Sequence, residues 1–126
     1  MNLSSARKAA EFVGIASVDA TGRPICAIVP GHKGNQYKVS LARTKERIII
    51  LECFNLNETE VCKGFQHNGI CFHSLAVLIY SAQEKNVKLK FCKTIEGARL
   101  IQKLGGTIIE VTSKSNLNKS VFVVGS

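Results

Sequence analysis

The chain has 126 residues, enough for one domain with a modest core, and 45% of them are hydrophobic, too many for a disordered chain. Its longest apolar run, residues 75–80, is far shorter than the roughly 20 residues of a membrane-spanning helix. The 17 basic and 9 acidic residues give a net charge of +8, and such an excess favours a polyanionic partner, because phosphates bind Lys and Arg with release of counterions.

The N-terminal residues and the cysteine count indicate an intracellular protein. No long apolar segment follows the first basic residues, so we expect no signal peptide. The five cysteines are an odd number, which would leave one thiol unpaired in a disulfide framework. We therefore expect a cytoplasmic chain, or a nuclear one in a eukaryote, whose reduced cysteines serve as metal ligands or core residues.

The first part of the chain has the pattern of one short helix followed by strands. Alanines and charged residues at helical spacing predict a helix over residues 4–12. Alternating or continuous apolar runs predict strands at residues 12–19, 25–30, 37–42 and 47–54. Four strands at such close spacing predict an antiparallel meander or a small barrel.

The second part begins with residues 55–70, which have little periodicity and predict a loop without a core of its own. Residues 73–84 have helical length and are apolar nearly all round, so this helix should be largely buried. The remaining predicted elements are a strand at 86–93, a helix at 94–106 capped by Thr94, strands at 107–112 and 120–125, and a polar loop at 113–119. The simplest architecture is one α+β domain: a small antiparallel sheet, a loop that leads into a buried helix, and a C-terminal helix with further strands.

Four soft ligands lie within residues 53–73 at the spacing C-x8-C-x8-C-x-H. They are Cys53, Cys62, Cys71 and His73. Tetrahedral zinc takes four such ligands, and a Cys3His set makes a closed structural site rather than an open catalytic one. Free cysteines are also common in cores, but the clustering favours a metal site over separate core thiols. We predict one structural Zn²⁺, which would order the loop at residues 55–70.

The stretch VCKGFQHNGICFHSLAVLI resembles the SWIM zinc-finger family, whose pattern is Cys-x-Cys, a variable spacer, and Cys-x-His entering an apolar helix. Residues 71–78 match the second half of that pattern, and residues 37–53 are similar to the hairpin before such fingers. The resemblance covers about residues 37–80. It implies a structural zinc and binding to DNA or to proteins.

The chain departs from the family pattern in its first cysteine pair. If Cys62 is the second cysteine of that pair, Glu60 stands at the position of the first. We expect Cys53 to replace it, with residues 54–61 as an inserted loop. Glu60 and His67 remain alternatives for the fourth ligand.

The other two cysteines, Cys26 and Cys92, lie in strand-like segments without a nearby ligand partner, so we expect them in the core or on a sheet face. His32 belongs to a polar loop flanked by glycines. We expect it to be solvated or to make a weak phosphate contact.

The basic residues form two clusters along the sequence. The first consists of His32, Lys33, Lys38, Arg43, Lys45 and Arg47, and the second of Lys85, Lys88, Lys90 and Lys93. Such residues suffice for phosphate contacts, and Tyr37 can add a stacking platform. A solvated basic face without a partner is the alternative interpretation.

These patterns predict a zinc-containing protein that binds DNA or RNA with little sequence preference. The alternative is an adaptor that uses the finger to contact another protein. We expect no enzyme and no small-molecule substrate, because the chain has no Gly-rich phosphate loop and no recognisable catalytic set, and four protein ligands leave zinc no open position.

Overall fold

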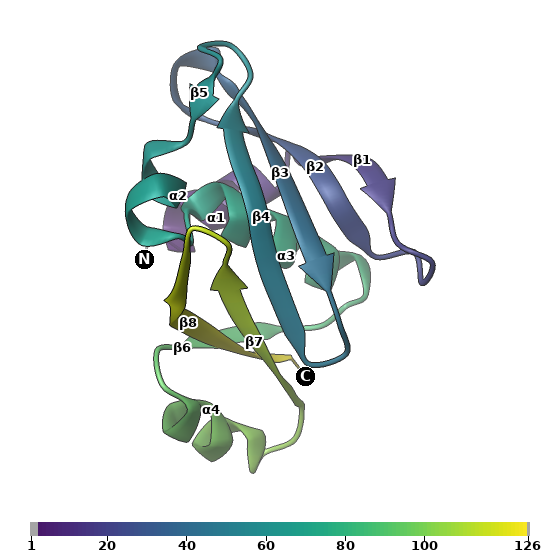
Figure 1. The fold of residues 1–126 in the computed structure, drawn as a ribbon. Helices are drawn as coiled ribbons and strands as arrows, with labels where there is room; N and C mark the ends of the chain where they lie inside the picture. The colour runs from purple at the N-terminus through teal and green to yellow at the C-terminus, as the bar shows by residue number, and fades with distance from the viewer. Residues whose placement is uncertain (1–2, 126) are drawn as a thin grey trace.

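The computed structural model describes residues 3–125 and confirms the α+β class (Figure 1). In this range helices pack against a mixed sheet of eight strands. The elements are α1 (Leu3–Ala10), β1 (Gly14–Val18), β2 (Pro24–Pro30), η1 (His32–Gly34), β3 (Gln36–Arg43), β4 (Arg47–Asn55), β5 (Glu60–Val61), α2 (Lys63–Asn68), α3 (Phe72–Glu84), β6 (Leu89–Cys92), α4 (Ile95–Gln102), β7 (Thr107–Ser113) and β8 (Asn116–Gly125).

The sheet has the strand order β1-β2-β3-β4-β7-β8-β6, with β5 paired to β4. The predicted antiparallel meander is present as β1 to β4. The pairing of β4 with β7 is parallel, from Arg47 opposite Glu110 to Ile50 opposite Ser113, which differs from the wholly antiparallel sheet that we expected. A parallel pair needs a long crossover connection, and the chain between β4 and β7 supplies it with α2, α3, β6 and α4.

Two segments predicted as loops are more regular than their sequences indicate. Residues 55–70 contain a short hairpin of β4 with β5, followed by the helix α2. Its turn is held by the Oδ1 atom of Asn55, which accepts hydrogen bonds from the backbone N–H groups of Asn57 and Glu58 at 3.0 and 3.1 Å. The loop predicted at residues 113–119 is instead a tight turn followed by the start of β8. Most side chains there are exposed, Leu117 to 68%. Because neither face of this part of the strand is buried, its sequence has no alternation of apolar and polar residues.

The helix α3 is the centre of the core. It packs against β2, β3 and β4 on one side and against α1 on another, which explains why its residues are apolar nearly all round. Its buried run extends from His73 to Ile79, as predicted. The small buried residues of α1, among them Ala6 and Ala10, allow that helix to approach α3 closely.

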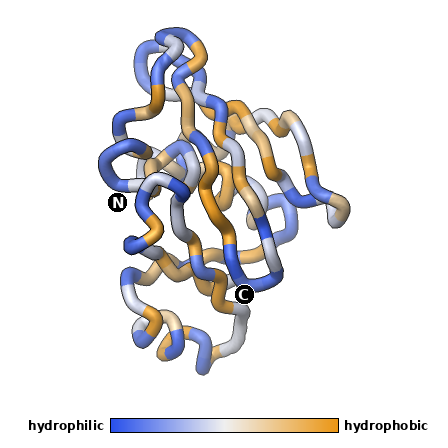
Figure 2. The backbone as a smooth tube through the Cα atoms, in the orientation of Figure 1, coloured by the Kyte–Doolittle hydropathy of each residue, from blue (hydrophilic) through white to orange (hydrophobic). Residues whose placement is uncertain are grey.

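The two faces of the sheet differ. We call the face against α3 the inner face and the opposite one the outer face. The apolar run of β4 crosses the centre of the sheet (Figure 2), with Ile48 and Ile50 buried and Ile49, between them, half-buried. The helix α4 packs at one end of the sheet on β6, β7 and β8 (Figure 1), and its N-terminus is capped as predicted, because the hydroxyl of Thr94 accepts from the N–H of Gly97 at 3.1 Å. Between residues 3 and 125 no helix combines the length and apolar character needed to cross a membrane.

The alternation along β4 yields a stability prediction. Replacing Ile50 by Ala removes a side chain that is fully buried, which should lower the free energy of unfolding by about 2–5 kcal/mol. Ile49→Ala, the control on the outer face, should cost clearly less. Urea unfolding with an unchanged m value measures both losses, and equal losses would contradict the assignment of the inner face.

Candidate metal centre

Three segments of the chain meet at the predicted ligands. Cys53 lies on the inner face of β4, and Cys62 is the residue directly after β5. The two residues are neighbours, because the N–H of Cys62 donates to the carbonyl of Cys53 at 2.9 Å. Cys71 is the residue before α3, and His73 lies in the first turn of that helix. A Cβ added at Gly64 would lie only 3.1 Å from the Cβ of Cys71, so glycine permits the close approach of α2 to this residue. Residues 54–61 thus form a hairpin that brings the thiols of Cys53 and Cys62 together.

The geometry of this group matches a tetrahedral metal site. All four residues are buried, and their ligand atoms lie within 4.8 Å of one another. The Nδ1 atom of His73 is 3.6 Å from the sulfur of Cys53 and 3.6 Å from that of Cys62. Tetrahedral zinc with bonds of about 2.3 Å to sulfur and about 2.05 Å to nitrogen places these ligand atoms about 3.6 Å apart. The group can therefore hold one metal ion, and its donor set is that of structural zinc.

The protonation of the three thiols also favours a cation. Hydrogen bonds from Cys53 and Cys71 lower the pKa of Cys62, while the bond to Cys62, the bond to Cys71 and burial raise the pKa of Cys53. The bond from Cys53 lowers the pKa of Cys71, but the bond to Cys62 and burial outweigh it, so that the pKa of Cys71 is raised. One thiolate is thus favoured at the expense of the other two. A bound dication would favour the thiolate form of all three cysteines by binding their sulfur atoms, and it would displace the remaining protons.

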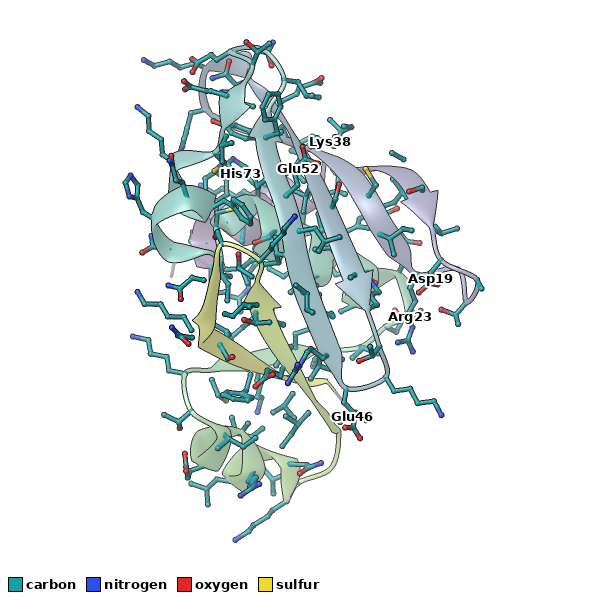
Figure 3. The ribbon with its side chains drawn as sticks, in the orientation of Figure 1. Asp19, Arg23, Lys38, Glu46, Glu52 and His73 are labelled. Carbon is teal, nitrogen blue, oxygen red and sulfur yellow. The ribbon has the colours of Figure 1, made fainter. Side chains whose placement is uncertain are left out.

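The ring of His73 is held by neighbours that the sequence did not reveal as part of the site. Tyr37 stacks on it with ring centroids 3.7 Å apart and planes inclined by 19°. The hydroxyl of Tyr37 in turn accepts a hydrogen bond from the side-chain amide of Asn55 at 3.2 Å. Tyr37 and Asn55 are opposite each other in the pairing of β3 with β4. The hydrogen bond between them therefore follows from the strand register, which the sequence patterns did not predict. Figure 3 shows His73 behind the sheet, beside α2.

The alternative fourth ligands lie elsewhere. Glu60 and His67 are both exposed, and neither belongs to the buried group. Among the alternatives, the arrangement therefore favours Cys53. The remaining cysteines, Cys26 and Cys92, are half-buried on strands, as expected, and the sulfur of Cys26 lies 3.8 Å from the hydroxyl of Ser40.

The first basic cluster is divided between the ends and faces of the β3–β4 hairpin. His32 and Lys33 lie at the end of the hairpin near the candidate metal ligands, as does Tyr37. Lys45 lies in the turn at the opposite end. Lys38 is on the outer face, where its ammonium group is 3.8 Å from a carboxylate oxygen of Glu52 (Figure 3).

Three residues of the predicted nucleic-acid contacts are engaged within the protein. One face of the Tyr37 ring lies against His73 and is not available for stacking on a base. Arg43 points to the inner face, where its Nε donates to the carbonyl of Pro24 at 2.7 Å. Arg47 pairs with Glu110 at 2.9 Å. The first basic cluster is therefore close together in sequence but not on one surface, because alternate residues of a strand face opposite sides of the sheet.

The second basic cluster is exposed and meets part of the first. Lys85, Lys88, Lys90 and Lys93 are all exposed, and Lys85 lies directly after α3. Lys45 and Lys85 line the same hollow at the C-terminal end of α3. Lys93 lies apart from them, beside Lys119.

No protein-family model, curated protein or solved structure matches the chain. The buried Cys3His group is consistent with a zinc finger, and the resemblance to the SWIM family stays a prediction.

The metal centre predicts one zinc per chain that stabilises the fold. Cys71→Ser should abolish stoichiometric zinc and lower the free energy of unfolding by several kcal/mol, because metal binding is coupled to the folding of the hairpin and α2. Elemental analysis should give about one equivalent for the unaltered chain. Cys26→Ser is the matched control and should retain zinc. A fully folded chain without metal would contradict a structural role.

The stacking of Tyr37 on His73 predicts a supporting role in metal binding. Tyr37→Leu should keep the four ligands but weaken zinc affinity about 10-fold or more, because the imidazole loses the ring that orients it. Competition with a chromophoric chelator measures the affinity. Tyr80→Leu, at a half-buried tyrosine of α3 outside the metal group, should leave zinc affinity unchanged, and equal effects of the two substitutions would argue against the role of Tyr37.

Proposed function

We propose that the chain is a small structural-zinc protein that binds DNA or RNA with little sequence preference. The observation that carries the proposal is the meeting of Lys45 and Lys85, one from each predicted basic cluster, at one end of the molecule. Lys88 and Lys90 follow along the chain toward and into β6, both exposed. These four ammonium groups supply the positive charge that phosphates require.

The distribution of acids supports this proposal. Two ion pairs form among residues 3–125, and they neutralise Lys38 and Arg47 rather than the four lysines above. The net charge of +8 is therefore left largely on exposed side chains. Phosphate contacts of this kind fix position without reading sequence, and α3, the helix beside the metal centre, is too deeply buried to enter a groove.

The zinc would act indirectly in this proposal. Three thiolates and one imidazole fill the four tetrahedral positions, so the ion would have no open position for water or substrate. Its role would be to fix the β4–β5 hairpin and α2 against the start of α3. For this reason we propose a binding protein rather than an enzyme.

One observation favours the adaptor as a second candidate. The hairpin beside the metal centre exposes Leu56 to 41% and Val61 to 45%, and apolar side chains of this kind are common in protein interfaces. An adaptor would contact its partner through this hairpin. Its binding would depend much less on salt than phosphate binding does.

A salt titration tests the nucleic-acid proposal. If the four lysines at this end contact phosphates, the affinity for duplex DNA should fall with a log–log salt slope of about −3.6, from roughly −0.9 for each phosphate. Fluorescence anisotropy with labelled duplexes of unrelated sequence should give similar slopes for all of them. No binding at low salt would support the adaptor instead.

Charge reversal locates the contact. Replacing Lys88 and Lys90 by Glu should weaken binding to all sequences alike and leave the zinc content intact. The control is the replacement of Arg7 and Lys8, two exposed basic residues of α1, by Glu. This double substitution changes the net charge by the same amount. Equal losses in the two double variants would show that net charge alone, rather than this end of the molecule, determines binding.

A further inference from the structure

A cavity of about 240 Å³ lies at the end of α3 that is opposite the metal centre. It is bounded by the C-terminal half of that helix, by the inner face of the sheet and by the residues that lead into β6. Its interior is aliphatic, lined by Ile48, Leu78, Leu89, Ile109, Val111 and Val123. Aliphatic walls of this kind favour an apolar body, because its binding removes apolar surface from water.

The mouth of the cavity is positively charged. Arg23, Arg43, Lys45 and Lys85 line it together with the aliphatic residues, and within residues 3–125 no Asp or Glu side chain does. Asp19 is an acid whose charge acts on Arg43 and partly compensates it. One carboxylate oxygen of Asp19 accepts within its own turn, from the hydroxyl of Thr21 at 2.6 Å and from the N–H of Arg23 at 3.0 Å.

The guanidinium group of Arg43 has an unfilled position at this site. Its Nε donates to the carbonyl of Pro24, but its Nη2 is buried and has no hydrogen-bond partner among the described residues. Burial, and then the charge of Arg23, lower the pKa of Arg43, which indicates that neighbouring groups do not fully compensate the positive charge. A buried charged donor without an acceptor is costly, and buried polar groups in proteins are nearly always paired. Arg43 also lines the cavity, so an anion bound there would lie beside this guanidinium group and compensate its charge.

We propose that this cavity binds a small amphiphilic anion, with a carboxylate or phosphate head at Arg43 and the mouth lysines and an apolar body among the aliphatic side chains. Its volume sets the size of the ligand, because a cavity of about 150 Å³ holds benzene. The body is therefore about one ring or a short alkyl chain.

An unstacked nucleic-acid base fits the cavity less well. Bases bind on aromatic side chains, and none lines this interior. The polar edge of a base would find few partners, since Ser81 and Thr107 are the neutral side chains there that carry hydroxyl groups. The ligand site is thus distinct from the proposed phosphate contacts of nucleic acid, although both draw on Lys45 and Lys85.

Titration of the zinc-loaded chain with four six-carbon probes tests the proposal. Hexanoate and hexyl phosphate should bind saturably and shift the backbone amide signals of residues around the cavity, and the tighter of the two identifies the head group. Hexan-1-ol and hexylammonium share the body but lack the negative charge, so they should bind at least 10-fold more weakly. Equal binding of hexan-1-ol and hexanoate, or no binding of either anion, would overturn the proposal.

Two variants separate the head contact from the body contact. Arg43→Gln removes the unpaired donor and should weaken binding of the anions about 10-fold or more. Val87 is a half-buried residue of the cavity wall, so Val87→Phe fills the cavity and should abolish binding of the apolar body. This variant tests the location of the site even if Arg43→Gln fails to fold. Lys38→Gln on the outer face is the control and should bind like the unaltered chain. Unchanged affinity in the folded Val87→Phe variant would overturn the site.

The experiment also separates this site from nucleic-acid binding. Reversal of Lys88 and Lys90, which do not line the cavity, should weaken hexanoate binding less than Arg43→Gln does, while it strongly weakens binding to DNA. Loss of hexanoate binding in that variant would contradict the assignment of the ligand to the cavity.

Discussion

The burial of three thiols and one imidazole at a single point is the constraint on which this end of the structure depends. Cys53 comes from the sheet, Cys62 from the end of the hairpin, and the other two ligands from the start of α3. The hairpin and α2 contribute little to the core, since Phe65 is the one buried residue of α2. A dication bound by three thiolates would hold this segment more strongly than its own apolar contacts do.

The helix α3 links the two candidate sites. Its 13 residues correspond to a length of about 20 Å, with the ligands Cys71 and His73 at its N-terminal end and the cationic cavity at its C-terminal end. Between them the helix is buried against the sheet and against α1. Because the middle of α3 is packed on two sides, both sites are positioned by the same rigid element. The metal would thus also support the cavity, through the orientation of the helix.

Strand geometry explains why neighbouring basic residues have different roles. Lys38 and Arg43 are both in β3, yet one forms an ion pair on the outer face and the other extends beneath α3 on the inner face. Conversely, Lys45 and Lys85 are 40 positions apart in the sequence and line one hollow. The proposed phosphate contacts are therefore chosen by the position of each residue in the fold. Membership of a sequence cluster predicts them only in part.

Sequence by itself determined the features that depend on local spacing. The four ligands, the strands β2 to β4, the cap at Thr94 and the burial of α3 all follow from residue types within one short segment. Hydrophobic periodicity failed where burial is not the cause of structure, as in the exposed start of β8 and in the hairpin turn held by Asn55. Only the tertiary structure decided the parallel pairing of β4 with β7, the stacking of Tyr37 on His73 and the cavity beside Arg43. Each of these joins residues far apart in the chain, and the free energy that selects such contacts comes from packing across elements, which no local pattern encodes.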